Sequence, residues 1–159
     1  MNKSLCCLVC FAVLSGLGLE RSSVGQDKAV EPQVLSLKPL EVTPDDDELR
    51  KLQKQRFNAA VSEAQANVAL YRGGTVTLDG TLESARRVVV AGTDMAETPA
   101  EKIAMIEMGV EVAQLLERIV KDRYENGVEP RQAMHQATYQ RCDWEIQLFR
   151  ARREAKAKE

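Results

Sequence analysis

Apolar residues recur at spacings of three and four from residue 43 almost to the end of the chain, which predicts helices rather than strands. They form four successive stripes: Leu49, Leu52, Phe57, Ala60, Ala64, Val68 and Tyr71; then Leu78, Leu82, Ala85 and Val89; then Ile103, Ile106, Val110, Ala113, Leu116, Val120 and Tyr124; and then Met134, Ala137, Trp144, Leu148 and Ala151. The pattern therefore predicts an all-α fold of four helices.

Start and stop signals divide these helices. Thr43–Glu48 combines a threonine cap, a proline in the first turn and carboxylates near the positive helix end, so the first helix is predicted to start there. Thr98–Glu101 is a capping box with proline at the first helical position, and Pro130 opens the fourth helix. Gly73-Gly74 and Asn126-Gly127 are stop signals, since glycine and asparagine tolerate the left-handed conformation.

Short turns between long helices make sequential helices antiparallel neighbours. We therefore expect two tandem antiparallel helical hairpins in one elongated domain, residues 43–157, with coiled-coil-like packing through the alanines. The last helix carries a second apolar face, formed by Tyr139, Cys142, Ile146 and Phe149. Two apolar faces predict that this helix packs between neighbours, and the charged tail from Arg150 is expected to fray.

The chain also repeats itself. Tyr71 and Gly74 match Tyr124 and Gly127, each pair 53 residues apart. Each unit reads helix, Tyr-x-x-Gly, short turn, helix, and the glycine supplies the backbone conformation that a reversal needs. Downstream of the turns the matching offset is 52, which aligns Leu82 and Ala85 with Met134 and Ala137.

The segments 68–77 and 122–130, which contain the two Tyr-x-x-Gly motifs, resemble the periplasmic helical hairpins of the TolC-type outer-membrane efflux proteins. In that family the turn is the periplasmic tip, where a membrane-fusion adaptor docks. The resemblance, over residues 49–150, implies a protein–protein interaction role linked to efflux. It assigns the docking tips to Tyr71, Gly73, Gly74, Tyr124, Asn126 and Gly127.

The resemblance is limited to the helical hairpins. Members of the family are several times longer and carry membrane strands between their helical pairs, whereas residues 91–100 are too few to hold two such strands. No channel is therefore predicted from this chain alone. Two alternatives remain open: a self-associating coiled-coil scaffold or chaperone of the periplasm, and a metal- or ligand-binding helical bundle.

The N-terminus has the layout of a secretory signal peptide, with Lys3 ahead of an apolar run over residues 5–19. That run is shorter than the roughly 20 residues of a spanning helix, although a retained membrane anchor is the alternative. Ser23-Val24-Gly25 favours cleavage before Gln26, so residues 1–25 are predicted to be removed. Residues 26–42 are predicted to form an extended leader. We expect export to the periplasm or cell envelope, with membrane contact peripheral at most.

Composition narrows the function classes further. The chain has 22 Lys and Arg against 24 Asp and Glu, a net charge of −2, which offers no basic excess for a nucleic-acid partner. Only 4% of its residues are aromatic, too few for a typical β-sandwich. Cleavage would remove three of the four cysteines and leave Cys142 without an internal disulfide partner, as a small buried hydrophobe or a site of intermolecular pairing.

Candidate catalytic and metal-binding residues are sparse. His135, the one histidine, lies seven residues before Cys142 on nearly the same helix face, without the further ligands or orienting acid that such chemistry requires. The row Glu107, Glu111 and Glu117 is interpreted as a solvated face, and Arg86-Arg87 as a surface cluster. No phosphate-binding loop or Ser/His/Asp set is present in the sequence. We expect no enzyme activity, cofactor or metal, and protein partners bound through coiled-coil packing, including a homo-oligomer.

Overall fold

A computed structural model describes residues 33–157. They form one 3-10 helix, η1 (Gln33–Ser36), and four α-helices: α1 (Glu48–Arg72), α2 (Leu78–Met95), α3 (Pro99–Glu125) and α4 (Arg131–Lys156). No strand occurs among these residues, which confirms the predicted all-α fold. The predicted signal peptide and residues 26–32 of the predicted leader lie outside the described residues.

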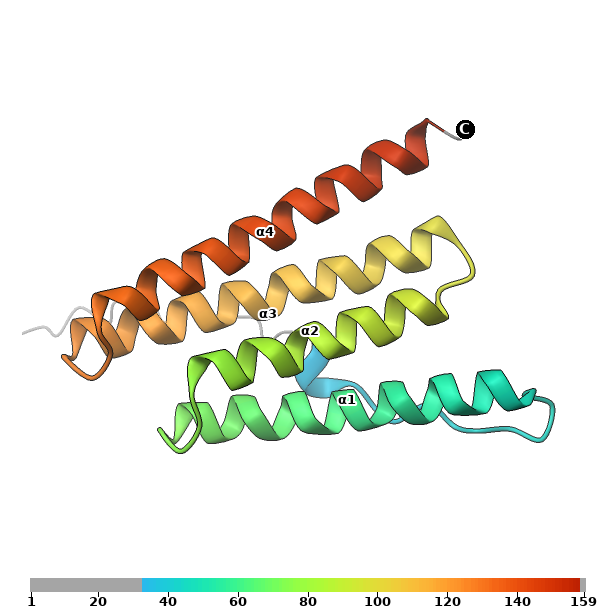
Figure 1. Ribbon diagram of the computed structural model, residues 1–159, viewed down its shortest axis with the longest axis horizontal. Helices are drawn as coiled ribbons and strands as arrows, with labels where there is room; N and C mark the ends of the chain where they lie inside the picture. The colour runs from blue at the N-terminus through green and yellow to red at the C-terminus, as the bar shows by residue number, and fades with distance from the viewer. Residues whose placement is uncertain (1–32, 158–159) are drawn as a thin grey trace, which may run out of the picture.

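The helices follow one another across an elongated molecule in chain order (Figure 1). α1 packs against α2 and α3 against α4, each pair antiparallel, and α2 joins the two hairpins by packing against α3. This arrangement confirms the two predicted antiparallel hairpins. The α1–α2 and α3–α4 turns lie at the same end of the molecule, and the α2–α3 connection lies at the opposite end.

The predicted start of the third helix is confirmed in detail, and α2 has a threonine cap that was not predicted. The Thr77 side chain caps α2 by accepting a hydrogen bond from the Gly80 amide. At α3, Thr98 accepts from the Glu101 amide, and the Glu101 carboxylate accepts from the amides of Glu97 and Thr98, which lower the pKa of that carboxyl. Both caps consist of hydrogen bonds between residues three or four positions apart, so neither depends on a tertiary contact.

The predicted start of the first helix is wrong by several residues. α1 begins at Glu48, capped by Asp47, whose carboxylate accepts from the Arg50 amide at 2.7 Å. The preceding Asp46 instead binds the Thr43 amide and the Lys54 ammonium, each at 2.7 Å, and Lys54 is the main cause of the lowered pKa of that carboxyl. These two contacts hold residues 43–46 in a turn ahead of the helix.

The described part of the predicted leader, residues 33–42, starts with a 3-10 helix and packs against the α-helices. Gln33–Ser36 forms η1, and the Val34 side chain is fully buried against the helices. Gln65 of α1 donates to the Val34 carbonyl at 3.0 Å, and Asn58 pairs with both the amide and the carbonyl of Leu40. Residues 37–43, after η1, form neither helix nor strand and are held along α1 by these side chains.

The buried apolar residues form two clusters. The larger one joins η1, α1, α2, α3 and the start of α4, and the smaller one centres on Trp144 and combines α2, α3 and α4. Gly109 lets the helices approach closely there, because a Cβ at this position would lie 2.9 Å from Val89 and 3.2 Å from Trp144. Small residues thus set the helix spacing, as expected for close helix packing.

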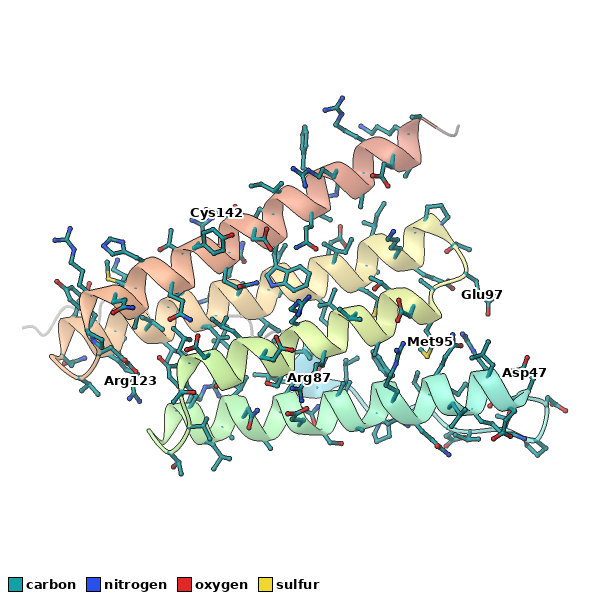
Figure 2. All side chains as sticks on the ribbon, viewed as in Figure 1. Asp47, Arg87, Met95, Glu97, Arg123 and Cys142 are labelled. Carbon is teal, nitrogen blue, oxygen red and sulfur yellow. The ribbon has the colours of Figure 1, made fainter. Side chains whose placement is uncertain are left out.

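Most of the predicted stripe positions are buried, but the first two are exposed. Leu49 is 65% exposed and Leu52 is also exposed. The reason is length: α1 has 25 residues and α2 has 18, and Arg50 already reaches the last residue of α2 through the Met95 carbonyl. In Figure 2, Asp47 lies beyond Met95 at this end of the molecule. The first turn of α1 therefore has no α2 beside it.

α4 departs from expectation in two ways. It remains helical through Lys156, although the tail from Arg150 was expected to fray. Its second apolar face does not pack between neighbours within residues 33–157, because Tyr139 is 71% exposed, Phe149 is 62% exposed and Ile146 is exposed as well. None of the helices in the described range combines the length and the hydropathy that crossing a membrane requires.

Candidate functional site

The two hairpin turns have the same backbone geometry. Gly74 and Gly127 adopt φ values of 74° and 73°, in the left-handed region where glycine carries no side-chain penalty. The Gly74 amide donates to the Tyr71 carbonyl and the Gly127 amide to the Tyr124 carbonyl, both at 2.9 Å. The predicted repeat is therefore present in the structure as a repeated helix C-cap.

The next hydrogen bond repeats as well. The Thr75 amide donates to the Leu70 carbonyl at 2.9 Å, and the Val128 amide donates to the Arg123 carbonyl at 2.8 Å. These six-to-one bonds satisfy carbonyls that the helix end leaves without intrahelical partners. Each turn has five residues, 73–77 and 126–130, so α2 and α4 begin 53 residues apart. The offset of 52 seen downstream is thus not a difference in turn length.

Side chains from the second hairpin bind the first turn. The Tyr71 hydroxyl donates to the Glu129 Oε1 at 3.1 Å, and the Arg123 Nε donates to the same oxygen at 3.2 Å. The Arg123 Nη1 donates to the Tyr71 carbonyl at 3.1 Å, and its guanidinium carbon lies 5.1 Å from the Tyr71 ring centroid. We call Tyr71, Arg123 and Glu129 the turn lock. Figure 2 places Arg123 at the end of the molecule that carries both turns.

The turn lock is largely shielded from solvent. Tyr71 is 1% exposed, and the Arg123 and Glu129 side chains are 20% and 17% exposed. Burial, and then the hydrogen bond to Glu129, raise the pKa of Tyr71 to about 12, while Arg123 opposes the shift. Tyr71 therefore stays neutral across the physiological pH range, and its hydroxyl donates a hydrogen bond to Glu129.

A second contact joins the hairpins at this end. Gln136, in the second turn of α4, donates to the carboxylate of Asp79, in the first turn of α2. Together with the turn lock, this hydrogen bond connects all four helices near the turns. The end that carries the two turns is therefore a single cross-connected unit; we call it the turn end.

The structure brings the six predicted tip residues to the turn end, but in two environments. Gly73, Gly74, Asn126 and Gly127 are exposed, and Tyr124 is 38% exposed. Tyr71 is buried in the turn lock, so its side chain supports the turn end from inside. Two apolar residues that sequence reasoning missed, Leu70 and Val128, are also exposed beside the turns.

Arg123 and Glu129 were missed as well. At an offset of 53 they correspond to Leu70 and Val76, so the second repeat carries a pair of charges where the first carries two apolar residues. This departure from the repeat was visible in the sequence. The charged pair at these positions would have indicated a polar contact at the second turn that has no equivalent at the first.

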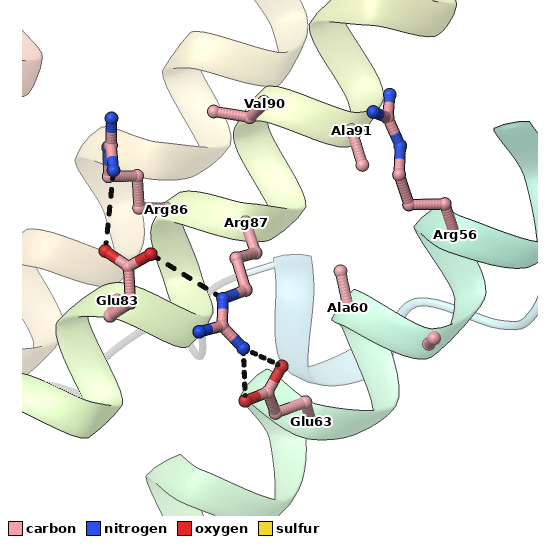
Figure 3. Close-up of a pocket in the computed structure, with 9 residues that line it drawn as sticks. Arg56, Ala60, Glu63, Glu83, Arg86, Arg87, Val90 and Ala91 are labelled. Atoms are coloured by element: carbon pink, nitrogen blue, oxygen red, sulfur yellow. Dashed lines mark hydrogen bonds and ion pairs between the residues drawn. The ribbon is translucent and has the colours of Figure 1, made fainter.

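A groove between α1 and α2 gathers the predicted basic pair (Figure 3). It is an open groove of about 420 Å³ with Ala60 and Ala91 among its lining residues. Arg87 pairs with Glu63 at 3.0 Å and with Glu83 at 3.6 Å, and Arg86 pairs with Glu83 at 3.5 Å. The arginine charges are engaged by carboxylates of the same groove.

The carboxylate row of the third helix is not simply solvated. Glu117 binds Arg141 at 2.6 Å and Glu107 binds Arg152 at 2.6 Å, so two of the three carboxylates connect α3 to α4. Glu145 and Glu117 raise the pKa of Arg141 through these bonds. His135 is exposed and Cys142 is a half-buried free thiol. Within residues 33–157, no three histidine, cysteine or acidic side chains gather as a metal site would require.

Comparison of the chain with models of protein families, with curated proteins and with solved structures finds no match.

Proposed function

We propose that the chain is an exported helical protein that acts in the cell envelope by binding another protein through its turn end. The two turns form the docking surface, as the resemblance to the periplasmic hairpins of efflux outer-membrane proteins implies. The single observation that carries this proposal is the turn lock, which ties two turns from separate hairpins into one surface.

The turn lock favours binding because it orders the surface in advance. Immobilising loops at an interface costs free energy that would otherwise contribute to affinity, and a surface ordered by the fold avoids much of that cost. Both turns have a complete set of cap hydrogen bonds, and Arg123 binds across to the Tyr71 carbonyl. A partner would therefore meet a preformed surface.

The chemistry of the turn end indicates the kind of partner. Tyr124, Leu70 and Val128 expose apolar surface, while the glycines between them leave the backbone accessible. Tyrosine is enriched at protein interfaces because it combines apolar area with a hydroxyl that hydrogen-bonds. A helical partner with an apolar groove, such as an envelope adaptor of the efflux type, fits this surface.

A capture experiment tests the proposal. The exported chain is used to recover partners from envelope extract, alongside a Val128→Asp variant of the turn end and a Leu49→Asp variant of an exposed leucine at the opposite end. We expect the wild type and Leu49→Asp to recover the same helical envelope protein and Val128→Asp to lose it. Equal recovery by all three proteins, or none by any, would overturn the proposal.

The export step has its own test. Expression of the full chain in a Gram-negative host, followed by N-terminal sequencing of the periplasmic fraction, should give a protein that starts at Gln26. Retention of residues 1–25 on a membrane-bound product would instead support the alternative that these residues are a membrane anchor.

A self-associating scaffold is the second candidate function. It is favoured by one specific observation, the exposed apolar face of α4, which includes Tyr139 and Phe149.

A further inference from the structure

The outer face of α4 is built like one strand of a coiled coil. Tyr139, Cys142, Ile146, Phe149 and Arg153 follow one another at spacings of three, four, three and four, which is the a/d pattern of a helix–helix seam. Tyr139, Ile146 and Phe149 are all exposed, and Cys142 is half-buried. We call these five residues the α4 seam.

The α4 seam lies opposite the face that packs within the chain. Trp144 and Ala137 are buried on the inner face, and Ile146 is two positions, or about 200° of helix rotation, from Trp144. α4 packs mainly against α3 in the described part of the chain. The helix therefore has two apolar faces, of which residues 33–157 cover one.

We propose that the α4 seam binds the α4 seam of a second copy of this chain, in an antiparallel arrangement with a two-fold axis. A two-fold contact requires a self-complementary surface. If a residue of one copy contacts a given residue of the second copy, the same pair of residues is in contact again with the copies exchanged. Ile146 of each copy packs against Phe149 of the other, so these two residues form the apolar centre of the contact.

Charges flanking the seam specify this alignment. When Ile146 faces Phe149 of the second copy, Asp143 lies next to Arg150 of that copy, and symmetry makes the pair twice. Arg150 is exposed, and the Asp143 carboxylate accepts a hydrogen bond from the neutral Gln147 amide at 2.8 Å. The two charges lie seven residues apart on one helix, about 10 Å along the axis, so they are better placed for a second chain than for each other.

The basic end of α4 argues for the antiparallel orientation. Arg153 and Lys156 follow Phe149 along the seam face. In a parallel pair, each of these residues would lie against the same residue of the second copy. Like charges in register destabilise a helix pair. In the antiparallel alignment Lys156 instead meets the ring of Tyr139, where a cation is favourable.

Sedimentation of the full chain over a range of concentrations tests the proposal. We expect a monomer–dimer equilibrium, with Ile146→Glu remaining monomeric and Leu52→Glu, a matched change at an exposed leucine of α1, retaining the dimer. The Val128→Asp variant of the turn end should also retain it, so failure here and failure of the proposed docking function are distinguishable. Circular dichroism should show equal helix content in every variant. A wild type that is monomeric at all concentrations would overturn the proposal.

Charge reversal tests the alignment. Asp143→Arg and Arg150→Asp should each weaken the dimer roughly fivefold or more, because each places like charges together, and the double variant should restore it. A double variant as weak as the single ones would reject the Asp143–Arg150 pairing.

The native thiol tests the orientation. In the proposed alignment the two Cys142 residues are separated by 11 helical positions, about 16 Å, which is too far for a disulfide. Mild oxidation of the dimer should therefore give no disulfide-linked species. Rapid formation of a Cys142–Cys142 disulfide within the dimer would show a parallel pair and overturn the proposal.

Discussion

The turn after α1 and the turn after α3 make the same backbone hydrogen bonds, yet Tyr71 in the first is 1% exposed and Tyr124 in the second is 38% exposed. Arg123, near the end of α3, and Glu129, in the turn after α3, both bind Tyr71 at the end of α1. The equivalent positions of the first repeat carry Leu70 and Val76. These uncharged residues cannot make the corresponding contacts to Tyr124. The residues that repeat thus specify the backbone of the two turns. Arg123 and Glu129, which do not repeat, specify how the two hairpins are joined.

Truncating the two tyrosines should separate the two environments most strongly. Tyr71→Ala should lower the free energy of unfolding by about 3–5 kcal/mol, the range for a large buried aromatic, because it empties a filled site and removes the partner of Glu129. Tyr124→Ala should cost less than about 1 kcal/mol because the ring is partly solvated already. Urea denaturation of both variants measures the contrast, and equal losses would mean that the two turns are equivalent.

Replacing Arg123 and Glu129 by their counterparts in the first repeat should measure how much the turn lock contributes to the free energy of unfolding. Arg123→Leu alone should cost about 2 kcal/mol, because Glu129 keeps a shielded carboxylate without its cation. The double variant Arg123→Leu/Glu129→Val copies the residues of the first turn and should cost less than the sum of the single changes. A double-variant loss equal to that sum would argue against direct coupling of the two charges.

Substituting the two left-handed glycines should show what the turns share. Gly74→Ala and Gly127→Ala should each cost about 1–2 kcal/mol, because an added Cβ is strained at these φ values in both turns. A Cβ at either glycine meets no atom closer than 3.7 Å, so the penalty is conformational. Gly80→Ala, in the first turn of α2 at negative φ, serves as the control and should not destabilise. Thermal unfolding measures both losses, and a clear difference between Gly74→Ala and Gly127→Ala would contradict a shared turn geometry.

Removing only the Tyr71 hydroxyl should cost about 1 kcal/mol at neutral pH, the value for one hydrogen bond. The pKa of Tyr71 is raised to about 12 in the folded protein, from about 10 in an unfolded chain, so folding favours the neutral form. The advantage of wild type over Tyr71→Phe should therefore be complete below about pH 10 and disappear as the pH rises towards about 12. A stability difference that stays constant over that interval would contradict the assigned pKa.

Local signals were enough to predict much of this fold. The Thr98–Glu101 capping box and Gly127 act through neighbours within a few residues, and each begins or ends its helix as predicted. The start of α1 was misjudged because Asp46 is held by Lys54, a contact from the following helix that competes with the threonine signal. Leu49 was assigned to the core because helical periodicity does not report where the neighbouring helix ends.

The candidate site was predicted less completely. The motif identified the residues that make the turns, because glycine at positive φ is a local requirement. It could not identify the turn lock, in which Tyr71 contacts residues more than 50 positions away. It also could not identify the exposure of Leu70 and Val128, which depends on how the hairpins meet. The exposed seam of α4 was recognised as an apolar face, but its partner within the chain was wrongly expected.

Amide hydrogen exchange in an Arg123→Leu variant tests the central claim that the second hairpin orders the first turn. The reporters are the Thr75 amide in the first turn and the Val128 amide in the second, with the Lys102 amide, bonded to Thr98 at the far end, as the reference. We expect the Thr75 amide to lose protection by roughly tenfold or more relative to Lys102, although the substitution lies in the other hairpin. Loss confined to Val128, with Thr75 unchanged relative to Lys102, would contradict it.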